Sequence, residues 1–186
     1  LHLASRRQRQ MCIRDSYIGA MDWNPNVQGL SWFLDEVWPK VLRELPESNL
    51  RLAGRKFEDH LNLHQTNTTV LGEVENAWEV LNNSGIMIIP LHSGSGMRIK
   101  AIEAMSAGRP VVSTSLGMEG INGQHGTHFF IADDANSFAQ CIIDLYKNEH
   151  IAQEMGEAAR AFVEAEFSNN ALIQSLIESI RHIFNL

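Results

Sequence analysis

Short apolar runs alternate with longer segments of helical periodicity along most of the chain, from residue 17 onward. The run at 86–89 contains no polar residue, as is typical of a parallel strand that is covered on both faces. Strand and helix patterns alternate in units of about 20 to 30 residues, which predicts an α/β fold with a doubly wound, Rossmann-like parallel sheet of six strands. The predicted strands are 17–20, 50–54, 69–72, 86–90, 110–114 and 128–132.

The clearest helical pattern follows the first predicted strand. Apolar residues recur there at spacings of three, four, seven and eight positions between Leu30 and Leu45, which is the stripe of an amphipathic helix. Asn24 can cap this helix, Pro25 suits its first helical position, and Pro39 predicts a kink. Further helices are predicted over 58–65, 74–83, 98–107, 135–147, 150–166 and 169–184.

Composition fits one globular domain. The chain has 186 residues, of which 44% are hydrophobic and 20% charged, enough to bury a core. No apolar run approaches the ~20 residues of a membrane helix, so no transmembrane segment is expected. Cys12 and Cys141 form neither a disulfide framework nor a metal-ligand spacing. Cys141 shares a helical stripe with apolar residues and is predicted to be a core thiol in a reducing, cytoplasmic environment.

Charge divides the first sixteen residues from the rest. Residues 1–16 hold four arginines and one aspartate without any periodicity, and we expect them to be a disordered or non-native extension that resembles translated adapter sequence. The predicted domain is therefore 17–186. That part carries 11 basic and 21 acidic side chains, which argues against a nucleic-acid partner.

Four of those basic residues gather after predicted strands. In doubly wound sheets, ligands bind at the carboxyl ends of the strands, near the point where the strand order reverses. The loops at that edge are 20–26, 54–57, 72–76, 90–98 and 114–127. Arg55 and Lys56 follow the second strand, and Arg98 and Lys100 follow the fourth. The sequence thus predicts a local positive site on an acidic domain.

The stretch "SGSGMR" at 93–98 favours an anion site. Gly94 and Gly96 allow a close backbone approach to a ligand, and the amides that open the next helix are unpaired. Arg98 and Lys100 would oppose the helix dipole unless a phosphate or diphosphate compensates for them. A flexible turn without a ligand is the alternative.

Glu103 stands three residues after Lys100, so the two can share a helix face. One interpretation is a surface ion pair, which contributes little to stability. The other is a carboxylate that accepts hydrogen bonds from the vicinal hydroxyls of a ribose. Spacing alone leaves both open.

Three segments carry a family resemblance: "GSGMRIKAIEAMSAGRPVVSTSLGMEGI", "IGAMDWNPN" and "LGEVEN". Together they resemble the C-terminal, donor-binding domain of retaining glycosyltransferases of family 4, which have the GT-B architecture. The resemblance runs from about Tyr17 to the last predicted helix. It implies transfer of a sugar from a nucleotide-diphosphate sugar, without a metal ion or other cofactor. The acceptor, a glycan or a lipid, would bind a missing N-terminal domain, and the chain alone would be inactive. A cytoplasmic protein, at most peripheral at the inner membrane face, is implied as well.

The resemblance also assigns residues. Glu103 matches the glutamate that holds the ribose hydroxyls. The loop that meets the diphosphate and the sugar is matched by Gly94, Gly96 and Met97. Gly72 and Val74 match the segment beside the nucleobase, and Gly19 and Asn26 match the first glycine-containing turn. Arg55 and Lys100 are our choices for the catalytic residues, as phosphate-neutralising cations.

Two departures from the family pattern concern charge. Ser95 stands where many relatives carry a second glutamate, and "GAMDWNPN" lacks the arginine and lysine that many carry after the first strand. We expect Arg55, Arg98 and Lys100 to replace that charge.

Rival functions remain open. A non-catalytic nucleotide-sugar binding module and a nucleotide-sugar 2-epimerase share this architecture, whereas a dehydrogenase would need a G-x-G-x-x-G turn after the first strand. His92 could touch the sugar and Trp23 could stack on a base, but structural roles are the simpler interpretation for both. Ser113, Thr114 and Ser115 could equally reach a ligand hydroxyl or cap a strand end. Glu119 is a candidate for donor contact, and Asp133 and Asp134 suit a solvated turn. The apolar stripe from Leu172 to Ile183 predicts a tendency to self-associate.

Overall fold

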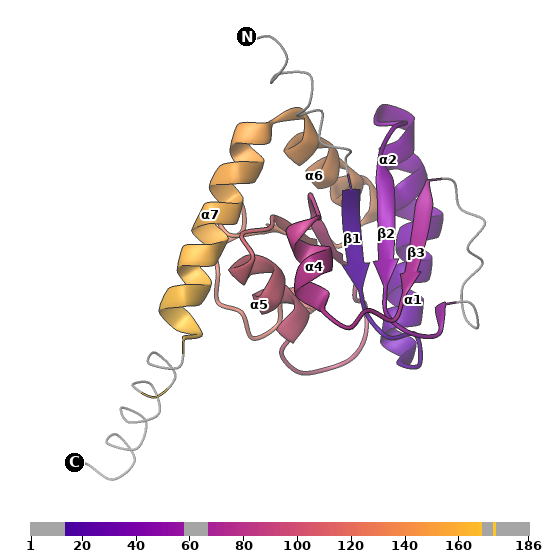
Figure 1. Cartoon of the computed structure of the whole chain (residues 1–186). Coiled ribbons are helices and arrows are strands. Elements are labelled where there is room, and N and C mark those ends of the chain that lie inside the picture. Colours follow the sequence, from indigo (N-terminus) through magenta and orange to yellow (C-terminus); the bar gives the residue numbers. More distant parts are fainter. Residues whose placement is uncertain (1–13, 58–66, 169–172, 174–186) are drawn as a thin grey trace, which may run out of the picture.

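The computed structural model describes residues 14–57, 67–168 and 173. Its centre is a six-stranded, all-parallel sheet in the order β3-β2-β1-β4-β5-β6 (Figure 1). The doubly wound α/β fold with six strands is thereby confirmed, and each predicted strand is present. The strands are β1 (Arg14–Ile18), β2 (Asn49–Ala53), β3 (Thr68–Gly72), β4 (Met87–Ile89), β5 (Val111–Ser113) and β6 (Phe130–Ile131).

Strand β1 begins earlier than the sequence predicts. Arg14 pairs with Asn49 of β2, and the pairing continues to Ile18. Asp15 and Ser16 are fully buried, so the predicted start of the first strand at residue 17 is three residues too late. Neighbouring strands on both sides bury these polar residues, which no apolar pattern signals. Residues 1–13 lie outside the described part.

The first long helical segment changes its hydrogen bonding midway. It consists of α1 (Asn24–Trp32), the π-helix η1 (Phe33–Val37) and α2 (Trp38–Glu44). Trp23, not Asn24, is the N-cap, and no side chain caps the helix. Pro39 lacks a backbone donor, and directly before it the Trp38 amide donates to the Phe33 carbonyl in the wider π pattern. At the position where Pro39 predicts a kink, the structure thus has a π-helical turn.

The remaining helices follow the predicted order. The cap of α4 is Asn76 and that of α6 is Asp134, so Asp134 has a structural role. Predicted helices at 58–65 and 169–184 lie outside the described residues. The elements are α4 (Ala77–Asn82), α5 (Ile99–Ser106), the 3₁₀-helix η2 (Leu116–Met118), α6 (Ala135–Lys147) and α7 (Glu149–Glu166). None of the helices described is long and apolar enough to span a bilayer.

Two hydrophobic clusters cover the two faces of the sheet. Alternate strand residues point to opposite faces, so Ile88 and Val112 belong to one cluster while Met87, Ile89 and Val111 belong to the other. Helices α1, α2 and α6 cover the first face, whereas α4, α5 and the second half of α7 cover the other (Figure 1). Cys141 packs half-buried against the first cluster, and burial raises the pKa of its thiol to about 11.

Candidate functional site

The strand order reverses between β1 and β4, which are neighbours in the middle of the sheet. From β1 the chain moves out to β2 and β3, and from β4 it moves out the other way to β5 and β6. In doubly wound sheets the loops on either side of such a reversal diverge, and ligands bind in the crevice expected between them at the carboxyl edge. Here the turn 19–23 follows β1 and the loop 90–98 follows β4, so these two segments border the expected crevice.

The glycine-rich loop before α5 has the backbone that its sequence predicts. Gly94 and Gly96 have φ angles of +98° and +90°, in the region that favours glycine. A Cβ on Gly94 would lie 2.8 Å from Cζ2 of Trp23, whereas a Cβ on Gly96 would meet nothing within 4 Å. Ser95 and Met97 are exposed, and Met97 lies near Gly120 of the next loop. The loop is therefore anchored at Gly94 and open at Gly96.

Arg98 is the N-cap residue of α5 and is only 6% exposed. Its Nη1 donates to the Ser95 carbonyl at 2.8 Å. Nε and Nη2 are buried and have no hydrogen-bond partner among the described residues. The guanidinium carbon lies 5.4 Å from the centroid of the Trp23 ring. Burying a cation with two unpaired nitrogens costs free energy. An anion bound beside Arg98 would reduce that cost by accepting hydrogen bonds from these nitrogens.

Lys100 ties α5 to the end of β1. Its Nζ donates to the Ile18 carbonyl at 3.2 Å and to Oδ1 of Asn26 at 3.0 Å, and it lies 4.8 Å from the centroid of the Tyr17 ring. Asn26 in turn donates from Nδ2 to the Ala20 carbonyl at 2.9 Å. Burial, together with the nearby charge of Arg98, lowers the pKa of Lys100 to about 8. The structure thus joins two predicted site residues, Asn26 and Lys100.

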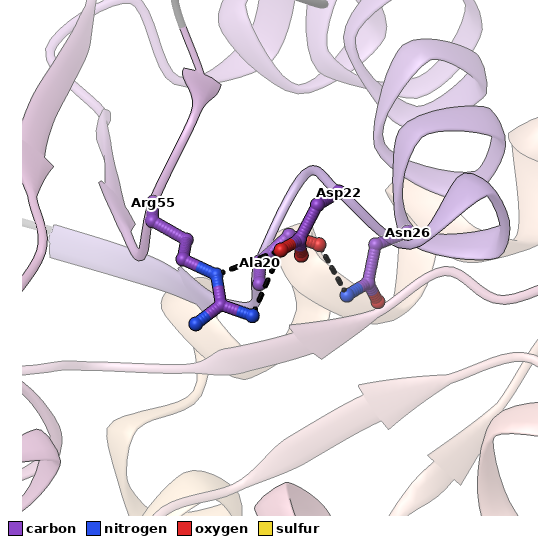
Figure 2. A network of polar contacts seen from close by, with 4 residues as sticks. All are labelled: Ala20, Asp22, Asn26 and Arg55. Carbon is purple, nitrogen blue, oxygen red and sulfur yellow. Dashed lines mark hydrogen bonds and ion pairs between the residues drawn. The ribbon is translucent and has the colours of Figure 1, made fainter.

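Arg55 has a carboxylate partner on the same rim. Its Nε and Nη2 donate to Oδ2 of Asp22 at 2.9 and 2.8 Å (Figure 2). The hydrogen bond from Arg55 lowers the pKa of Asp22. Arg55 therefore differs from Arg98: it lies at the predicted edge, but its charge is already compensated and both partners remain accessible to solvent.

Glu103 lies in α5 and is half-buried. It forms no ion pair with Lys100, which bonds to Ile18 and Asn26 instead. Within the described ranges its carboxylate has no hydrogen-bond partner. The surface ion pair that spacing left open is therefore wrong, and the carboxylate has its accepting capacity available.

The two residues predicted beside a nucleobase line different cavities. Gly72, at the end of β3, lines a cavity of about 250 Å³ together with Gly54, Arg55, Lys56, Phe57, Val70 and Glu73. Val74 lines a separate cavity of about 460 Å³ near Arg51 and α4. Gly72 has a φ angle of +70°, and a Cβ there would meet nothing within 4 Å. Of the two, Gly72 thus shares a cavity with the cations of the β2 end.

Other polar residues of this edge have structural contacts. The Ser113 and Thr114 hydroxyls donate to the carbonyls of Ile89 and Leu91, and Ser115 donates to Asp133. The His92 ring packs edge-on against the Trp32 ring, with 4.3 Å between the two ring centroids. Residues 14–57, 67–168 and 173 include no cluster of three or more His, Cys, Asp or Glu suited to a metal ion.

Two contributors were not identified by sequence reasoning. Asp22 is absent from the predicted site residues, although it is an acidic residue of the loop 20–26 at the expected ligand-binding edge. Trp23 was interpreted as packing or base stacking, whereas its ring contacts Gly94 and lies under Arg98. The sequence signal for both was their place in the loop 20–26.

Two relatives match much of the chain. An uncharacterized 44.6 kDa protein in the cps region of Klebsiella pneumoniae is 28% identical over 172 residues, covering 87% of this chain and 44% of that protein. N-acetyl-alpha-D-glucosaminyl L-malate synthase of Bacillus anthracis is 30% identical over 115 residues, covering 60% of this chain and 30% of the synthase. The chain thus spans less than half the length of these relatives.

Solved structures share the fold. A mutant of S. aureus TarM, in complex with Fondaparinux, alpha-GlcNAc-glycerol and UDP, matches 91% of this chain with a TM-score of 0.74 and 19% identity. Anabaena HepE in complex with UDP matches 96% with a TM-score of 0.72 and 16% identity. The match covers 35% of TarM and 51% of HepE. The described part of this chain accordingly has the fold of the matched part of these structures.

A family model adds sequence evidence to the shared fold. It describes glycosyl transferases group 1 and matches residues 16–148. This match includes the crevice between β1 and β4, the glycine-rich loop and Glu103. Because it covers more than half of the chain, the chain belongs to the family of glycosyl transferases group 1.

Proposed function

We propose that this domain binds the nucleoside diphosphate of a sugar donor at the carboxyl ends of β1 and β4. The unpaired guanidinium of Arg98 carries the proposal, because two of its nitrogens are buried without a partner in the described structure. Lys100 adds a second charge that no carboxylate there balances. Charge-assisted hydrogen bonds from a diphosphate would compensate both cations.

The other contacts of the donor follow from the same placement. Gly96 has open space where a Cβ would be, so its backbone can approach the phosphates closely. The Glu103 carboxylate, which lacks a partner in the described part, would accept hydrogen bonds from the ribose hydroxyls. The cavity of about 250 Å³ beside Gly72 and Phe57 would receive the base. Gly19 and Asn26 shape the turn opposite, and Met97 and Ser95 face the sugar.

In the complete enzyme we infer transfer with retention of configuration. The bond from the sugar C1 to the diphosphate breaks, and a bond from an acceptor hydroxyl to C1 forms on the same face. The departing phosphate oxygen accepts the proton of that hydroxyl, so no protein nucleophile, metal or cofactor is required. Arg98 and Lys100 would stabilise the charge that develops on the leaving group. Arg55 contributes once its pair with Asp22 rearranges.

The acceptor belongs to a separate half of the enzyme in this proposal. We infer a glycan or a lipid acceptor, hexosyl transfer and a role in polysaccharide biosynthesis, supported by the cps-region relative. The enzyme would act in the cytoplasm, at the inner membrane face where its acceptor is a lipid. We expect the present chain to bind the donor without transferring its sugar, and measurable transfer by this chain alone would contradict that.

Calorimetry on the full chain with UDP and GDP tests the donor site. We expect one of them to bind, and Glu103→Gln to weaken that binding by about 10- to 150-fold, since hydrogen bonds to charged groups contribute roughly 1.5–3 kcal/mol. Glu47→Gln removes an exposed acid and serves as the charge-matched control.

The corresponding 2′,3′-dideoxy nucleotide, which lacks the ribose hydroxyls, distinguishes loss of the Glu103–ribose contact from a general disruption of the binding site. If Glu103 holds the ribose, Glu103→Gln leaves the affinity for the dideoxy nucleotide unchanged. Equal losses for both nucleotides would refute the ribose contact, and no binding of either diphosphate to the parent chain would refute the proposed function.

A further inference from the structure

Trp23 contacts both the glycine-rich loop and the unpaired arginine. The turn after β1 brings its ring within 2.8 and 2.9 Å of the place where a Gly94 Cβ would be. The guanidinium of Arg98 lies over the same ring, with its carbon 5.4 Å from the centroid. Nη2 of Arg98 is in turn 3.5 Å from that Cβ position. Trp23, Gly94 and Arg98 therefore form one packed group beside the crevice.

We propose that Trp23 is a positioning residue, which holds the Arg98 guanidinium beneath the glycine-rich loop without neutralising its charge. An aromatic ring attracts a guanidinium through its face but offers it no hydrogen-bond acceptor. Nε and Nη2 thus keep their capacity to donate. The inference rests on the proposed function, since it assigns those two donors to the diphosphate.

The neighbouring residue shows the contrast. Asp22 precedes Trp23 in the same turn and contacts the other arginine of this edge, Arg55, through a carboxylate that pairs with it (Figure 2). A carboxylate in the place of Trp23 would pair with Arg98 in the same way and compete with an anionic ligand. Two adjacent residues of this turn therefore contact two arginines. The charge of Arg55 is balanced by a carboxylate, whereas that of Arg98 is not balanced by one among the described residues.

A packing role alone explains Trp23 poorly. Trp32 and Trp38 pack on Phe138 and Phe33 in the core, whereas Trp23 belongs to neither core cluster of the described residues and is 39% exposed. The Trp23 ring also requires a glycine at position 94, because any side chain there would collide with the ring. Glycine at that position therefore accommodates the ring as well as the positive φ angle.

The first test needs no nucleotide. In NMR spectra of the parent chain we expect the ring current of Trp23 to shift the side-chain signals of Arg98 and its Nε–H to exchange slowly. Trp23→Ala should abolish both features, and Trp23→Phe should retain most of the shift. Trp78→Ala is the matched control, because Trp78 is 44% exposed and lies in α4. Unaltered Arg98 signals in Trp23→Ala would overturn the positioning role.

The second test measures coupling in the binding of UDP or GDP. Cation–π contacts are worth about 0.5–2 kcal/mol, so Trp23→Ala should weaken binding by about 2- to 30-fold. In an Arg98→Ala background the same change should have no further effect. An equal loss in both backgrounds would show that Trp23 acts independently of Arg98 and would refute the inference. A shifted Arg98 signal with no nucleotide binding would instead refute only the proposed function.

Discussion

Arg55 and Asp22 form an ion pair across the ends of β2 and β1, with Nε and Nη2 of the arginine 2.9 and 2.8 Å from one carboxylate oxygen. Arg98, on the other wall of the crevice, has no carboxylate partner in the described ranges and keeps two unpaired nitrogens. The two arginines were predicted to act alike, but the structure distinguishes them. Arg98 has two buried donors without a partner among the described residues, whereas the Nε and Nη2 donors of Arg55 are already engaged by Asp22.

Asp22→Asn should therefore strengthen the binding of a nucleoside diphosphate. The change removes a negative charge that repels the ligand and releases Arg55 from its pair. Exposed ion pairs contribute about 0–1 kcal/mol, so we expect a two- to fivefold gain in affinity by calorimetry. Glu47→Gln removes the same charge at a remote exposed site and should leave the affinity unchanged. Weaker binding in Asp22→Asn would mean that Asp22 holds Arg55 in the position that the ligand uses.

The two glycines of the loop should respond differently to alanine. Both have positive φ angles, and an unfavourable backbone conformation costs about 1–3 kcal/mol. Gly94→Ala adds a collision with Trp23, but Gly96→Ala adds none. We expect Gly94→Ala to lower the melting temperature more than Gly96→Ala does.

Binding gives the second readout for the loop glycines. Gly96→Ala should weaken the affinity for the diphosphate beyond its effect on stability, because its Cβ would occupy the space left for the ligand. Gly126 is the matched control: it has a φ angle of +82° and open space around it, and it lies in the turn before β6, where its amide donates to the Phe129 carbonyl. If Gly96→Ala and Gly126→Ala bind equally well, the ligand does not approach Gly96.

Much of the fold follows from periodicity and cap chemistry. Helix α6 begins and ends where the apolar spacing predicts, at Ala135 and Lys147, because Asp134 supplies its cap. The apolar run 86–89 predicts a parallel strand covered on both faces, and β4 is such a strand, with all three of its residues buried. The start of β1 could not be predicted from periodicity, because it contains the polar residues Asp15 and Ser16, which are buried by the strands on either side. Burial of that kind depends on neighbours that are distant in the sequence.

The site was predictable as an edge but not as a set of contacts. Strand order places the loops of Arg55, Arg98 and Lys100 at one rim, as expected. Which cation meets which partner depends on side-chain directions across loops that are tens of residues apart. The bond from Lys100 to Asn26 joins positions 74 residues apart, and no local pattern specifies it. Gly72 and Val74, two residues apart, line different cavities.

Asp15 should make stability depend on pH. Burial raises the pKa of this carboxyl to about 7 in the folded chain, although the hydrogen bond from Tyr146 opposes that rise. The folded state thus binds a proton between about pH 4 and 7 that the unfolded state releases. Stability from this group is present below pH 4 and is lost as the pH rises through 7. Asp15→Asn should remove that loss.

Urea unfolding at pH 5 and pH 8 measures the effect of Asp15. We expect the parent chain to lose about 1–4 kcal/mol relative to Asp15→Asn between these values, because one pKa unit corresponds to about 1.4 kcal/mol. Glu47→Gln should follow the parent at both values. An identical pH dependence in parent and Asp15→Asn would show that Asp15 is ionised in the folded chain.

Lys100 should make diphosphate binding weaken at alkaline pH. Burial lowers its pKa to about 8 in the free chain, and a bound diphosphate would raise that value by favouring the charged form. Below pH 8 the amine is protonated with or without ligand, so the affinity is constant. Above pH 8 binding must take up a proton, and the affinity should fall by up to about tenfold for each further pH unit until the bound pKa is reached.

Calorimetry at pH 7.5 and 9.5 in buffers of different ionisation enthalpy measures this proton uptake directly. Lys100→Arg keeps a charge that does not titrate in this range, so its affinity should be the same at both pH values. Lys147→Met removes an exposed lysine that pairs with Glu44 and should leave the pH profile of the parent intact. A parent affinity that stays constant to pH 9.5, without proton uptake, would mean that the Lys100 ammonium lies too far from the diphosphate to take part in catalysis.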